Sequence, residues 1–112
     1  MIVDLRTLTD HGPGIVWSRA SEDLNLNLVV LDPGAEIAEH VNAEVDVLLV
    51  AVEGEGAVSI DRREEVIRAG GMALIPRGAR RSIRAGAERL AYLTCHRRRH
   101  GLWPASPQRA QR

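Results

Sequence analysis

The sequence predicts an all-β fold, in which one domain forms a small antiparallel barrel or sandwich. Short apolar or alternating segments recur along the chain, and turn-forming residues separate them. No segment of helical length has apolar residues spaced 3.6 apart. The 112 residues suffice for one hydrophobic core. Closing the strands into a barrel would also remove exposed sheet edges.

The segment 24–31 is the clearest strand. It reads Leu-Asn-Leu-Asn-Leu-Val-Val-Leu, and this change from alternating to uniformly apolar residues is typical of a strand that is half buried at first. Asp32, Pro33 and Gly34 then turn the chain. Seven further strands are expected at residues 37–41, 45–52, 57–60, 65–68, 72–75, 81–84 and 90–95. The turns between them are rich in glycine, proline and aspartate, which suits hairpins and corners.

The two ends of the chain differ from the middle. Residues 1–14 contain a short apolar alternation at Ile2, Val3 and Leu5, which would add an edge strand. Residues 15–97 would form the barrel. Residues 98–112 form a basic C-terminal tail without periodicity, which we expect to be flexible.

Composition argues against several functions. The 15 basic residues, all of them arginine, balance 15 acidic ones, and three residues are aromatic, so nucleic-acid binding is not expected. No apolar run is long enough to span a membrane. The single cysteine, Cys95, excludes an internal disulfide, and the first residues lack the pattern of a secretory signal. We therefore expect a cytoplasmic protein.

Two segments of the chain resemble the two conserved motifs of the cupin superfamily, in order and with the family's spacing. The first matches at Gly34, His40, Asn42, Val47 and Gly54, and the second at Gly70, Pro76, Gly78, Arg81 and Ala85. The resemblance implies a double-stranded β-helix, the jelly-roll cupin barrel. It also implies a homodimer, which the apolar outward positions Leu48, Val50 and Val52 favour.

The metal ligands of the cupin motifs are mostly absent. The family has His, His, Glu and His where this chain has His40, Asn42, Val47 and Arg81. A guanidinium is permanently cationic and has no lone pair to donate to a metal, and valine has no donor atom. The resemblance therefore implies a metal-independent protein without a cofactor. A register shift of one residue would offer His40, Asn42 and Asp46 to a metal, but strand alternation favours Val47 as the inward residue.

In the cupin register, His40, Asn42 and Arg81 converge inside the barrel. We expect them to bind a small anionic organic ligand, with Arg81 making a forked contact and His40 orienting it, in a sensor-like or accessory protein. Alternatively, the chain is a metal-free isomerase, cyclase or lyase in which His40 moves a proton and Arg81 stabilises negative charge. A third interpretation is structural, with Arg81 paired to Asp46 or Glu44 at the barrel mouth.

Two other groups of residues attract attention. Cys95 and His96 are neighbours on a strand and should point to opposite faces, so they cannot act as a catalytic pair, and the arginines between His96 and His100 oppose a metal. Further arginines cluster locally, at positions 77, 80, 81, 84 and 97–99. Nearby glutamates and zero net charge argue against a nucleic-acid site there.

Overall fold

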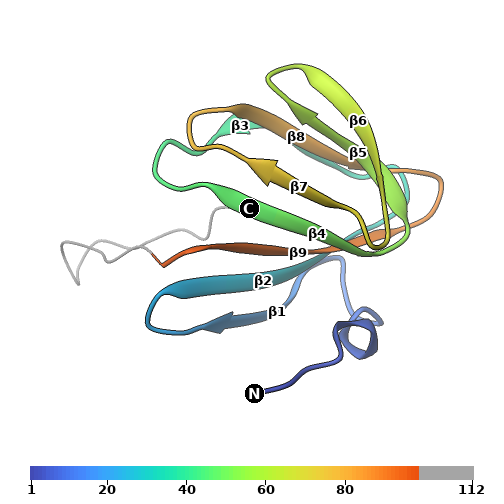
Figure 1. Cartoon of the computed structure of the whole chain (residues 1–112). Helices are drawn as coiled ribbons and strands as arrows, with labels where there is room; N and C mark the ends of the chain where they lie inside the picture. Colours follow the sequence, from blue (N-terminus) through green and yellow to red (C-terminus); the bar gives the residue numbers. More distant parts are fainter. Residues whose placement is uncertain (99–112) are drawn as a thin grey trace.

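The computed structural model describes residues 1–98, and the basic tail expected at 98–112 therefore lies almost entirely outside the described residues. These form one short 3-10 helix, η1 (Leu5–Leu8), and nine strands (Figure 1). The strands are β1 (Gly14–Ala20), β2 (Leu24–Leu31), β3 (Glu36–Val41), β4 (Val47–Glu53), β5 (Glu55–Ile60), β6 (Arg63–Arg68), β7 (Met72–Ile75), β8 (Arg80–Ala85) and β9 (Leu90–Arg97).

The strands form two sheets whose inward faces enclose the core. The five-stranded sheet has the order β1-β2-β9-β4-β7 and the four-stranded sheet the order β3-β8-β5-β6. All pairs between neighbouring strands are antiparallel, and consecutive strands lie in different sheets at every connection except β1–β2 and β5–β6. This confirms the predicted all-β barrel.

The N-terminal residues differ from the expectation of an edge strand within residues 1–14. Residues Leu5–Leu8 form η1, and the Asp4 side chain accepts the backbone N–H of Arg6 at its start. Carboxylate capping of this kind favours a helical turn over an extended strand. The edge strand of the sheet is β1 (Gly14–Ala20), and it pairs with β2. A bulge between Ile15 and Trp17 interrupts its alternation.

The β4–β5 corner needs a residue without a side chain. Gly54 has a φ of 82°, in the left-handed region. A Cβ atom there would collide with the backbone carbonyl oxygen of Arg89, which precedes β9. Glycine is therefore required twice over, by its dihedral angle and by the close approach of the next chain segment.

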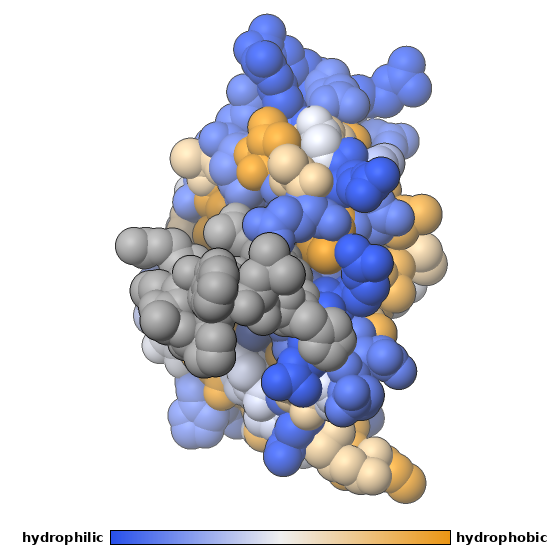
Figure 2. All heavy atoms as spheres, turned by 90° about the vertical axis from the view of Figure 1, so that its left-hand side faces the viewer, coloured by the Kyte–Doolittle hydropathy of each residue, from blue (hydrophilic) through white to orange (hydrophobic). Residues whose placement is uncertain are grey.

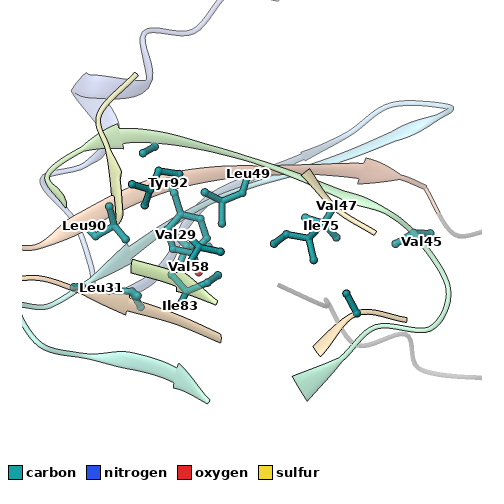
Figure 3. Packing of buried hydrophobic residues seen from close by; sticks show 14 residues of the cluster. Val29, Leu31, Val45, Val47, Leu49, Val58, Ile75, Ile83, Leu90 and Tyr92 are labelled. Carbon is teal, nitrogen blue, oxygen red and sulfur yellow. The ribbon is translucent and has the colours of Figure 1, made fainter. Parts of the chain in front are cut away.

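The core is aliphatic and lies between the two sheets. Val47, Leu49 and Ala51 alternate inward on β4 as predicted, and each is at most 2% exposed. The cluster includes Tyr92 with Val29, Leu31, Val58, Ile83 and Leu90 (Figure 3). Burying each large aliphatic side chain stabilises the fold by roughly 1.5–3 kcal/mol.

The core becomes polar toward one end of the barrel. Arg81 precedes Ile83 by two residues on β8, and Thr94 follows Tyr92 by two on β9, so both continue the inward face. The start of β8 and the end of β9 both lie at the left-hand side of Figure 1. Seen from that side, the surface is mainly hydrophilic with apolar residues among the polar ones (Figure 2).

Candidate ligand-binding site

His40 and Arg81 face each other across two paired strands. They are register partners on β3 and β8, and a shift in register between Ile37 and His40 brings them opposite. The Arg81 Nε–H donates to Nε2 of His40 at 3.1 Å. Nδ1 of His40 lies 2.8 Å from the carbonyl oxygen of Ala38. Since Nε2 accepts and Nδ1 faces an acceptor, the proton is on Nδ1 and the ring is neutral.

Arg81 is buried inside the barrel. It is 1% exposed and is the largest of the fully buried side chains in the described part of the chain. The structural interpretation, with Arg81 paired to Asp46 or Glu44, stays a prediction beside the ligand-binding one. A guanidinium cannot lose its charge, so the fold holds a permanent cation in its interior.

Asn42 builds the loop that joins the two sheets. It is 5% exposed, and its Oδ1 accepts the backbone N–H groups of Glu44 (2.9 Å) and Val45 (3.3 Å). Its own carbonyl oxygen accepts the N–H of Gly78 at 2.7 Å. Its buried Nδ2 has no hydrogen-bond partner in the part of the chain that the structure describes. Asn42 therefore offers a ligand a donor, while its oxygen is already in use.

The residues at the motif positions do not fit a metal. Nε2 of His40 faces a guanidinium, Oδ1 of Asn42 accepts from the loop, and the inward Val47 has no donor atom. Asp46 is exposed, and its Oδ1 accepts the backbone N–H of Arg77 at 2.8 Å. Among residues 1–98, no group of three or more His, Cys, Asp or Glu side chains could hold a metal ion. The alternative metal site through His40, Asn42 and Asp46 would have to use side chains whose Nε2 and Oδ1 atoms already accept these hydrogen bonds.

His96 is an inward residue that sequence reasoning missed. It is 5% exposed, while Cys95 beside it is partly exposed on the other face of β9, as predicted for strand neighbours. His96 pairs in register with Val47 of β4. Thr94, two residues earlier, is fully buried on the same face. Strand alternation starting from the inward Tyr92 would have predicted that Thr94 and His96 also face inward. His100 lies outside the described residues.

Connectivity brings these groups to the same end of the barrel. The loop 42–46 leads from the end of β3, which carries His40, to the start of β4. Val47 at that start lies beside His96 at the end of β9. We call this the polar end, defined by Asn27, His40, Asn42, Arg81, Thr94 and His96.

Ion pairs accompany the arginine cluster on the surface. Arg84 lies 3.2 Å from Glu64, and Arg62 lies 3.9 Å from Glu39. All four side chains are more than 40% exposed, so each pair contributes little to stability. Acidic and basic side chains are interspersed there, which does not favour an anionic polymer as partner.

The fold and site define a class, a small jelly-roll barrel in which a buried arginine is hydrogen-bonded to a partly exposed histidine at one end. The family model described as cupin domain matches residues 27–96, well over half of the chain. The chain therefore belongs to the cupin family. Within residues 1–98, no helix is long and apolar enough to cross a membrane.

Solved structures agree with the family. The protein TT1209 from Thermus thermophilus has 28% sequence identity and a TM-score of 0.74, over 86% of this chain and 95% of that one. BH2720 from Bacillus halodurans has 20% identity and a TM-score of 0.75, over 90% and 83%. KdgF from Halomonas sp. has 23% identity and a TM-score of 0.68, over 79% and 83%. None of the curated proteins matches the chain.

Proposed function

We propose that this cupin binds a small organic acid at its polar end, without a metal, and that Arg81 anchors the carboxylate. The observation that carries the proposal is the burial of Arg81, a permanent cation that is 1% exposed where the cupin motif has a metal-binding histidine. Electrostatic attraction is stronger in the interior than in water, so a buried guanidinium is a strong anchor for an anion.

The hydrogen bond to His40 supports this role, because it fixes one edge of the guanidinium. His40 receives the Arg81 Nε–H on a neutral ring, so it orients the group without adding a second positive charge. Asn42 adds a buried amide donor at the same end. Together they form a preorganised set of donors, which suits the oxygen atoms of a carboxylate.

Binding fits the geometry better than catalysis by His40. A general base needs a ring nitrogen with an available lone pair, and Nε2 of His40 already accepts from Arg81. Its Nδ1 is held against the Ala38 carbonyl oxygen. An isomerase, cyclase or lyase step through His40 would first have to break the contact that orients Arg81.

The test compares two arginines that are neighbours on β8. Arg81 points inward, and Arg80 is exposed on the outer face. A panel of mono- and dicarboxylic acids should raise the Tm of the wild type and of Arg80→Met, but not that of Arg81→Met. Circular dichroism verifies that both variants are folded. Equal shifts in the two variants, or none in the wild type, would contradict the proposal.

A further inference from the structure

At the polar end, the sheet that does not carry His40 and Arg81 also has a polar inward face. It consists of the inward side chains of Asn27 on β2 and of Thr94 and His96 on β9, which we call the β2–β9 wall. Asn27 is 7% exposed, Thr94 0% and His96 5%. Asn27 and Thr94 are register partners, so their side chains lie next to each other on the inward face.

Thr94 is the clearest sign that this wall serves a ligand. Its hydroxyl is completely buried and has no hydrogen-bond partner in the part of the chain that the structure describes. Valine has the same shape and would fill this place in a core without the unfavourable burial of an unsatisfied polar group. The presence of threonine here is explained if its hydroxyl forms a hydrogen bond with a polar group of a bound molecule.

The neighbouring polar groups are also oriented. The Ser18 hydroxyl and Oδ1 of Asn27 are 2.7 Å apart, which fixes the Asn27 amide. Nδ1 of His96 lies 2.9 Å from the carbonyl oxygen of Arg97, so Nδ1 carries a proton, and in the neutral ring Nε2 is an acceptor. His96 also borders a groove of about 360 Å³ on the outer side of β4 and β7, which is lined by Leu48, Leu74 and the loop residues Glu44, Val45 and Asp46.

The chemistry of the wall defines what it can bind. The Thr94 hydroxyl and the Asn27 amide are uncharged, and the neutral His96 ring offers an accepting nitrogen. With His96 neutral, a second carboxylate would find no cation among these three residues, and a methyl group would leave them unsatisfied. A ligand hydroxyl fits, because it donates one hydrogen bond and accepts others.

We propose that the acid held by Arg81 carries a hydroxyl group, which hydrogen-bonds with Thr94 and His96. The site then selects hydroxy acids over the corresponding acids without the hydroxyl. This inference rests on the proposed function, since Arg81 provides the carboxylate anchor. It adds a specificity that the cupin motifs do not contain, because Thr94 and His96 lie outside both motifs.

Calorimetric titration with two matched pairs of acids tests it: malate with succinate, and lactate with propionate. The wild type should bind the hydroxy acid of at least one pair about tenfold more tightly, the difference that one buried hydrogen bond makes. Thr94→Val should reduce this preference to about twofold or less and leave the affinity for the matched acid unchanged. Thr7→Val, far from the barrel interior, is the control and should retain the preference.

Thr94→Val should fold, because no hydrogen bond to the Thr94 hydroxyl is lost and the shape is conserved. His96→Leu is the second variant and should also lose the preference. Equal binding of both acids by the wild type, or a preference that survives in Thr94→Val, would overturn the inference while the Arg81 site stands. If none of the four acids binds, the proposed function fails for them and this inference fails with it.

Discussion

Arg81 donates its Nε–H to Nε2 of His40, and this 3.1 Å bond joins the two sequence positions that cupin motifs use for metal-binding histidines. Where the family motifs have two histidines that coordinate a metal ion, this chain has a histidine hydrogen-bonded to an arginine. Nε2 of His40 already accepts this hydrogen bond, and the permanent positive charge of Arg81 lies next to it. This arrangement supports the proposed binding of an anion at the polar end.

His40 should act by positioning Arg81. His40→Ala removes the acceptor of the Nε–H, so we expect about tenfold weaker binding of the best acid of the panel and a loss of about 1 kcal/mol in the free energy of unfolding. His40→Gln retains a side-chain acceptor and should recover most of the affinity. Titration calorimetry and urea unfolding measure the two effects. Loss of affinity in His40→Gln as large as in His40→Ala would contradict positioning by a hydrogen bond.

Asn42 should stabilise the loop 42–46. Asn42→Ala leaves the backbone N–H groups of Glu44 and Val45 without their acceptor, and we expect a loss of about 1–3 kcal/mol in urea unfolding. Asn42→Asp keeps the acceptor oxygen and should be closer to the wild type. If both variants are as stable as the wild type, the loop does not depend on this side chain.

The purified protein should hold no stoichiometric transition metal, because the motif residues form no ligand set. Inductively coupled plasma mass spectrometry should find well below one metal ion per chain, and EDTA should leave the Tm unchanged. The result against this prediction would be one metal ion per chain that is lost in His40→Ala.

The homodimer remains a prediction, and the outer face of the five-stranded sheet is where we place it. Leu74 (61% exposed) and Met72 (63% exposed) pair in register with Leu48 and Val50 and extend the apolar strip. Light scattering should give a dimer at micromolar concentration, and Leu74→Glu should shift it toward the monomer, since a charge would be buried at the interface. A wild-type monomer would count against the dimer.

Much of the fold could be predicted because strand alternation is local. The bounds of β2 and β7 agree with the predicted ranges, and Val47, Leu49 and Ala51 face inward as their spacing of two requires. β1 was missed because the bulge between Ile15 and Trp17 breaks its alternation. Local patterns cannot show a bulge whose cause is pairing with another strand.

The site was predictable only in part. The cupin register placed His40 and Arg81 together, and they are together, but their hydrogen bond depends on the register shift in β3. Thr94 and His96 were missed because β9 reads Leu-Ala-Tyr-Leu-Thr-Cys-His-Arg, which has no clear alternation of polarity. Which of its faces is inward depends on its two neighbours, β2 and β4.

The direct test of the central claim is the NMR signal of the Arg81 Nε–H group, followed during titration with malate. Its burial and its bond to His40 protect this proton from exchange with water, so its signal should be observable. We predict a saturable shift of the Arg81 signal, with little change for exposed arginines such as Arg80 and Arg84. Malate binding that shifts other arginines and leaves Arg81 unchanged would contradict the account.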